Sequence, residues 1–258
     1  MKQARIVLVT LLIGFATFSC DNQTGKPQNE KIKVKEDNLT ATKDIELARK
    51  LISSGYYYSA KNIIENTNYE SVSSKKLDSI KTVLDIELGM NKQEYERIRN
   101  KNWEELTTRN QDGTQIWFEQ KHFRHYTNTN LMSIYYGIDR QPSSSMINSL
   151  IFKITYSGRD WIYFSKINLI YEKTIVQMIE FNEENKKIDL DKPIESIHIH
   201  FPYNKSKLIK YLYNFSLSES SQIQLIGKDT LVRKLNEEEK LGILDVLESY
   251  TITSETIN

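Results

Sequence analysis

The chain has 258 residues, of which 39% are hydrophobic and 27% charged, and its net charge is +1. This is the composition of a globular protein and excludes a disordered chain. Lys2 and Arg5 precede a predicted cleavage site, and removing them from the 35 basic residues leaves 33 against 34 acidic ones, a net charge of −1. Nucleic-acid binders usually carry a basic surplus that displaces counterions from phosphates, so we expect no nucleic-acid partner.

Residues 1–19 have the pattern of a signal peptide. Lys2 and Arg5 form a positive start, and an apolar run follows from Ile6 to Phe18. This run is shorter than the roughly 20 apolar residues that a membrane-spanning helix needs. Removal of the segment is therefore the favoured interpretation, and an uncleaved anchor helix is the alternative.

The segment closes with Thr17-Phe18-Ser19-Cys20, which contains the only cysteine of the chain. It resembles the lipobox of bacterial lipoproteins, although that motif usually has Leu where Thr17 stands. The resemblance implies that the Cys20 thiol carries a diacylglycerol, that the peptide is cut before Cys20, and that the new amine receives a fatty acid such as palmitate. Two or more acyl chains anchor a protein stably, so we expect a membrane-held protein that faces the periplasm or the cell surface. A lone cysteine in an ordinary secretory signal is the competing interpretation.

Residues 20–41 are predicted to be a flexible tether behind the lipidated cysteine. The stretch from Asp21 to Glu30 has no apolar periodicity and cannot bury itself. Lys31, Lys33 and Lys35 are interpreted as part of a solvated linker.

A helical region is predicted over residues 42–100. The first helix runs from Thr42 to a stop at Gly55, the second from Tyr57 to Glu65, and the third from Ser73 or Ser74 to Gly89. The segment from Ala48 to Ala60 resembles one helical hairpin of a tetratricopeptide-type repeat, which would imply a groove that holds peptides. No second copy follows at the period of about 34 residues that an array requires, so a small helical cap on a sheet domain is the preferred interpretation.

Residues 101–252 are predicted to form an α+β domain with a mainly antiparallel sheet, followed by a tail at 253–258. The expected strands are Ile116–Phe123, Leu131–Ile138, Ser149–Tyr156, Trp161–Ile167, Thr174–Phe181, Ile197–Phe201, Gln222–Ile226 and Leu231–Arg233. Ser157-Gly158-Arg159-Asp160 is predicted to join Ser149–Tyr156 and Trp161–Ile167 as an antiparallel hairpin. One helix is expected from Ser206 to Phe215, and a closing helix is expected to begin at the cap Asn236, with Glu239 reaching back to it and Leu241, Leu244 and Leu247 buried.

The stretch from Trp117 through the Tyr156–Trp161 turn to the Gly227 hairpin and the closing helix is similar to uncharacterised domains of bacterial lipoproteins. The resemblance covers more than half of the chain. Those relatives have no assigned activity, so the resemblance implies a fold and a location only.

The histidines give the only candidate metal ligands. His198 and His200 stand two apart on a predicted strand and so point to one face, where their imidazoles could bind a metal ion. Glu195 does not share that face, and His122 or His125 could contribute only if their strand is a neighbour. The preferred interpretation is a solvent-facing polar row on a one-sided sheet.

No catalytic motif is found in the sequence, so no catalytic residue and no cofactor is predicted. The chain has fifteen Tyr, nine Phe and three Trp, and exposed rings among them could form a contact surface. The sequence favours a non-enzymatic binding module of the cell envelope, with the lipid bilayer as one partner through the acylated Cys20 and an envelope protein or glycan as another. The alternative is an envelope hydrolase, metal-dependent or otherwise, with a site near His198 and His200.

Overall fold

The structure is a computed structural model of the chain. It describes residues 28–67, 74–90, 107–109, 114–120, 123, 129–141, 144–147, 150–181, 186–201 and 206–257. The predicted signal peptide, Cys20, His122 and His125 lie outside the described residues.

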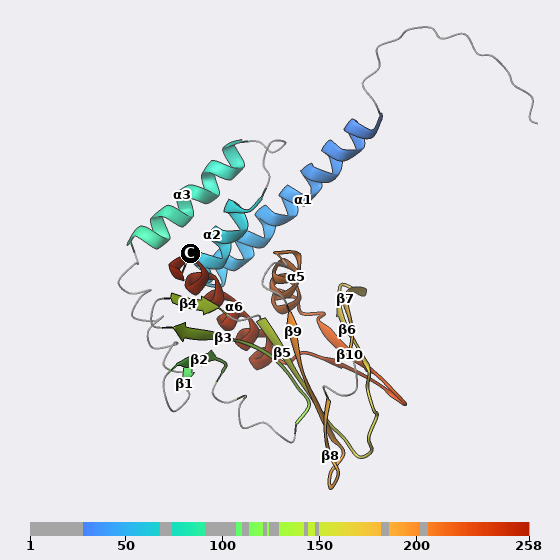
Figure 1. Cartoon of the computed structure of the whole chain (residues 1–258). Coiled ribbons are helices and arrows are strands. Elements are labelled where there is room, and N and C mark those ends of the chain that lie inside the picture. The colour runs from blue at the N-terminus through green and yellow to red at the C-terminus, as the bar shows by residue number, and fades with distance from the viewer. Residues whose placement is uncertain are drawn as a thin grey trace, which may run out of the picture.

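The described residues form an α+β fold with antiparallel strand pairing, as the sequence predicts, and their strands divide into two sheets where one was expected. Its helices are α1 (Gln28–Ser53), α2 (Tyr57–Glu65), α3 (Ser74–Met90), α5 (Ser206–Leu217) and α6 (Glu237–Ile257). In Figure 1, α1, α2 and α3 lie together on one side of the sheets, and α6 passes behind β3.

The larger sheet has the strand order β1-β2-β3-β5-β9-β8, with β4 also paired to β3. These strands are β1 (Thr107–Arg109), β2 (Gln115–Phe118), β3 (Leu131–Gln141), β4 (Ser144–Ile147), β5 (Leu150–Ser157), β8 (Lys186–Asp189) and β9 (Ile194–Phe201). The smaller sheet has the order β11-β10-β6-β7, with β6 (Lys166–Tyr171), β7 (Thr174–Glu180), β10 (Gln222–Ile226) and β11 (Thr230–Lys234).

One hydrophobic core connects the helices with both sheets. Leu51 of α1, Ile63 of α2, Phe152 of β5, Ile167 of β6 and Leu247 of α6 belong to the same buried cluster. The two regions predicted as separate units, 42–100 and 101–252, therefore bury their apolar faces against each other.

The predicted helical faces of α1 and α2 are confirmed. Ile45, Ala48 and Leu51 are buried, as are Ala60 and Ile63. Gly55 adopts φ +83, and the Tyr56 N–H donates to the Leu51 carbonyl at 2.9 Å, which is the left-handed helix stop expected at this position.

Two boundary predictions are wrong. Helix α1 begins at Gln28 and not at Thr42, so residues 28–41 are helical where a flexible tether was expected. This stretch is rich in Lys and Glu, which have high helix propensity even without an apolar face. Helix α6 continues to Ile257, so residues 253–257 are helical where a tail was expected. Leu244 and Leu247 of α6 are buried as predicted, whereas Leu241 is 53% exposed.

The hairpin predicted between Ser149–Tyr156 and Trp161–Ile167 is also wrong. β5 pairs with β3 and β9, whereas the following strand β6 begins only at Lys166 and belongs to the smaller sheet. Residues 158–165 therefore connect the two sheets. The next hairpin along the chain is formed by β6 and β7, and Glu172 and Lys173 are its turn residues.

A buried carboxylate explains the irregular course of residues 162–164. Glu195 of β9 is 0% exposed and accepts hydrogen bonds from the N–H groups of Ile162 (2.7 Å), Tyr163 (2.7 Å) and Phe164 (3.1 Å). Lys186 of β8 adds an ion pair with Glu195 at 3.0 Å. Because these N–H groups bind a side chain, they are not available for pairing with β5.

Candidate functional site

The outward face of the larger sheet carries a row of polar and aromatic side chains. In β9, Ile197 is buried in the core while His198 and His200 are exposed on the opposite face, as the sequence predicts. The strand register places Lys153 of β5 beside His198, and Ser133 of β3 beside Lys153. Residues from three neighbouring strands therefore meet on this face.

Three rings on this face contact one another, and we call Trp117, Tyr135 and His198 the aromatic row. The ring centroids of Trp117 and Tyr135 lie 5.8 Å apart at 65°, and those of Tyr135 and His198 lie 5.7 Å apart at 74°. Both contacts are edge-to-face, an arrangement that aromatic pairs favour. The Tyr135 hydroxyl oxygen lies 2.8 Å from His198 Nδ1.

The protonation states of this pair follow from their surroundings. Burial, followed by the charge of Glu119, raises the pKa of Tyr135 to about 12, so its hydroxyl keeps its proton at neutral pH. Although the His198 side chain is reached by solvent, partial burial of its ring is the largest cause that lowers its pKa, and the charges of Lys153 and Lys187 lower it further, so the imidazole is neutral at neutral pH. The Tyr135 hydroxyl and His198 Nδ1 therefore share a hydrogen bond between two neutral groups, whose donor is set by the tautomer of His198.

An ion pair stands beside the aromatic row. Lys153 Nζ lies 2.9 Å from Glu119 Oε1, and the two side chains are only 14% and 15% exposed. Lys153 also donates to the Phe123 carbonyl at 3.2 Å. These contacts hold Lys153 and Glu119 in fixed positions, so the aromatic row has an ordered, charged neighbour.

The metal hypothesis at His198 and His200 gains no further ligand from the structure. Among the described residues no group of three or more His, Cys, Asp or Glu side chains is placed to hold a metal ion. His198 Nδ1 is occupied by Tyr135. Glu195 lies on the core side of β9, as expected from strand alternation. A metal ion at these two histidines stays a prediction.

Trp117 and Tyr135 were not predicted as site residues, although the alternation of inward and outward residues could have found them. Trp117 stands between the buried Ile116 and Phe118 of β2, and Tyr135 between Ile134 and Tyr136 of β3. An aromatic residue between two inward-facing residues of a strand points outward. What the sequence does not contain is the pairing of β3 with β5 and of β5 with β9, which brings the three rings together.

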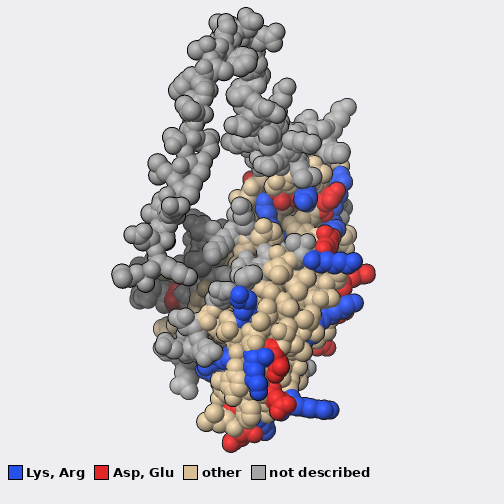
Figure 2. Space-filling model, turned by 90° about the vertical axis from the view of Figure 1, so that its right-hand side faces the viewer, with Lys and Arg blue, Asp and Glu red and all other residues tan. Residues whose placement is uncertain are grey.

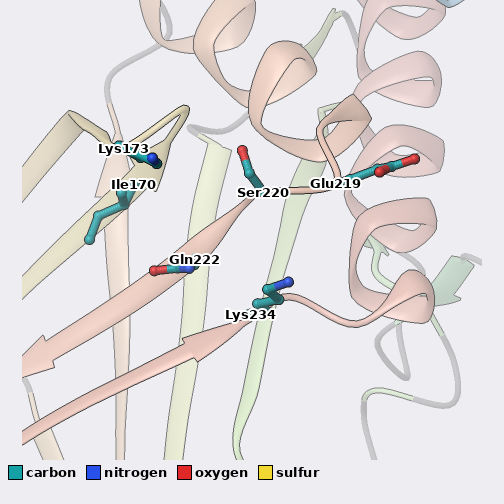
Figure 3. Close-up of a pocket in the computed structure, with 6 residues that line it drawn as sticks. All are labelled: Ile170, Lys173, Glu219, Ser220, Gln222 and Lys234. Carbon is teal, nitrogen blue, oxygen red and sulfur yellow. The ribbon is translucent and has the colours of Figure 1, made fainter.

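A separate pocket of about 350 Å³ lies at one end of the smaller sheet (Figure 3). It is lined by Ile170, Lys173, Glu219, Ser220, Gln222 and Lys234. None of these residues was predicted as a site residue.

The face of the molecule shown in Figure 2 has no large area of one charge sign among the described residues. On the face shown in Figure 2, described Lys and Arg side chains are interspersed with Asp and Glu. In the described part of the chain, no helix has the length and apolar character needed to cross a membrane.

Comparisons with protein-family models, curated proteins and solved structures find no match for this chain.

Proposed function

We propose that the protein is a lipid-anchored binding protein of the bacterial cell envelope and that the aromatic row is its contact surface for a partner protein. The anchor part rests on the sequence, with a positive start, a short apolar run and Cys20 at the predicted cut. The contact-surface part rests on one observation, the linked rings of Trp117, Tyr135 and His198 on the outward sheet face.

The chemistry of the row favours a protein over a glycan. Tyr and Trp are enriched at the centres of protein interfaces, where each buries a large area with few rotatable bonds. Because neighbouring rings lie edge to face, they do not form the flat surface on which a sugar ring would stack. Lys153 and Glu119 supply a charge of each sign at the border.

The anchor is tested by the substitution Cys20→Ser. The wild-type chain should fractionate with membranes and incorporate labelled fatty acid, and the variant should lose both properties. If the variant fractionates and is labelled as the wild type is, the proposed lipid anchor at Cys20 is wrong.

The contact surface is tested by photo-crosslinking in intact cells. A photoreactive amino acid replaces the exposed His200 beside the row, and a matched control replaces Leu241, which is 53% exposed on α6. We expect a discrete protein adduct from position 200 that is absent from position 241 and disappears when Tyr135→Ala is added. The same adducts from both positions would contradict the proposal, and an adduct with polysaccharide would assign the row to a glycan.

The hydrolase alternative rests on His198 and His200 alone. Metal analysis of untagged protein tests it, because stoichiometric zinc that is lost on replacing both histidines would favour the metal-dependent function.

A further inference from the structure

The pocket in the smaller sheet is formed by three separate segments. Lys234, Gln222 and Ile170 stand side by side across β11, β10 and β6, because Gln222 pairs with Lys234 on one side and Ile170 on the other. The β6–β7 turn adds Lys173, and the turn between α5 and β10 adds Ser220 and Glu219. In Figure 3, Ser220 and Gln222 lie between Lys173 on one side and Lys234 on the other, and the Glu219 side chain extends away from Lys173 and Gln222.

The pocket holds a surplus of positive charge. Lys173 and Lys234 each contribute one ammonium group, against a single carboxylate from Glu219. Neither lysine forms an ion pair within the ranges of the chain that the structure describes. Two unpaired amines that line one small opening attract an anion more strongly than either amine does alone.

The Lys173 turn is held in an uncommon conformation over this opening. Glu172 and Lys173 have φ angles of 49° and 64°. In two-residue hairpin turns, positions with positive φ are usually occupied by Asn or Gly. The Glu172 N–H donates to the Ser220 hydroxyl at 3.3 Å, which ties the turn to the pocket wall. Ser220 is in turn held by Ser218, whose hydroxyl oxygen lies 3.0 Å from that of Ser220. Backbone strain of this kind is concentrated at ligand sites.

We propose that this pocket binds a small phosphate monoester that carries hydroxyl groups, with the phosphate between Lys173 and Lys234. The two cations are lysines, which bind a phosphate group as point charges. Ser220 and Gln222 offer donors and acceptors to the hydroxyl groups of the ligand. The volume of about 350 Å³ is at the small end of ligand pockets and fits a ligand of this size.

The experiment is an amide NMR titration of the full-length chain in detergent micelles. The probes are inorganic phosphate, glycerol 3-phosphate, and phosphatidic acid added to the micelles, with phosphatidylcholine added as the lipid control. We expect saturable shifts at Lys173, Ser220, Gln222 and Lys234, with glycerol 3-phosphate binding more tightly than inorganic phosphate. The double variant Lys173→Met with Lys234→Met should weaken binding by about tenfold or more. The matched control Lys228→Met, at an exposed lysine of the β10–β11 turn, should leave binding unchanged.

The probes separate two sources of the phosphate monoester. Binding of free glycerol 3-phosphate assigns a soluble ligand, and lysine-dependent shifts with micellar phosphatidic acid alone assign a lipid headgroup. The proposal is overturned if no probe gives saturable shifts at the pocket, or if the double variant, with an unchanged amide spectrum elsewhere, binds as the wild type does.

Discussion

Glu195 is a single side chain that determines how the chain passes from one sheet to the other. Its carboxylate is fully buried, accepts three consecutive backbone N–H groups and pairs with Lys186, whose side chain is 1% exposed. Lys186 also donates to the Phe164 carbonyl at 3.0 Å. The connection from β5 to β6 therefore depends on a charge pair that water does not reach.

Replacing Glu195 by Gln should destabilise the fold strongly, because the Lys186 charge would be left buried without its counter-ion. Breaking a buried pair by removing one partner costs about 3–5 kcal/mol. The matched control is Glu65→Gln, which removes an ion pair with Lys61 whose side chains are 55% and 35% exposed, and should cost less than about 1 kcal/mol. Urea unfolding followed by circular dichroism measures both, and equal losses would show that Glu195 has no special role.

His198 should titrate below the ordinary histidine range. Burial and then Lys153 and Lys187 lower its pKa in the folded chain, so the folded state binds fewer protons than the unfolded state below pH 6.5. Stability is therefore unaffected by this group above pH 6.5 and falls as the pH drops from there through the folded pKa. The imidazole C–H shifts of His198 in an NMR pH titration give the pKa. Lys153→Met should raise it, and a pKa at or above 6.5 in the wild type would contradict the prediction.

At the scale of elements, α6 begins with a reciprocal cap that the sequence predicts correctly. The Glu239 N–H donates to Asn236 Oδ1 at 2.8 Å, and the Asn236 N–H donates to Glu239 Oε2 at 2.9 Å. The Glu239 carboxylate, fully buried, also accepts from Arg233 and from the Met132 N–H of β3 at 2.6 Å. The cap thus fixes α6 to both sheets.

Asn236→Ala should lower the free energy of unfolding by about 1 kcal/mol, because the Glu239 N–H loses its acceptor. Glu238→Ala, at an exposed position of the same first turn, serves as the control and should cost less. Thermal unfolding of the two variants measures the difference. A control that is as destabilised as Asn236→Ala would mean that the helix start, and not the cap, is sensitive to substitution.

At the scale of the whole molecule, what the sequence predicts correctly is local. The hairpin of β10 and β11 and the Asn236 cap each depend on residues within a few positions of one another. The course of the chain after β5 depends on Glu195, more than thirty positions downstream of Ile162, and no pattern around Trp161 contains that information. The aromatic row and the pocket of the smaller sheet were missed for the same reason, since strand pairing and turn docking place their members together.

The helical region and the sheets should unfold together, because a side chain of α6 caps α2. The first turn of α2 has no side-chain cap of its own, and the N–H groups of Tyr58 and Ser59 donate instead to Glu248 at 3.0 and 2.7 Å. The Ser59 hydroxyl also donates to Glu248 and accepts from Tyr213 of α5 at 2.7 Å. The N-terminus of α2 is therefore held by two helices from the far end of the chain.

Glu248→Ala should cost about 2–3 kcal/mol, since hydrogen bonds to a charged acceptor are lost and buried donors are left unpaired. Because one core spans both regions, far-ultraviolet and near-ultraviolet circular dichroism should show the same single transition in the wild type and in the variant, at a lower midpoint in the latter. Glu46→Ala, at an exposed position of α1, controls for the loss of a carboxylate. A first transition at lower denaturant or temperature, seen only in the far-ultraviolet signal, would mean that the N-terminal helices fold as an independent unit. Glu248 would then be a docking contact between two domains.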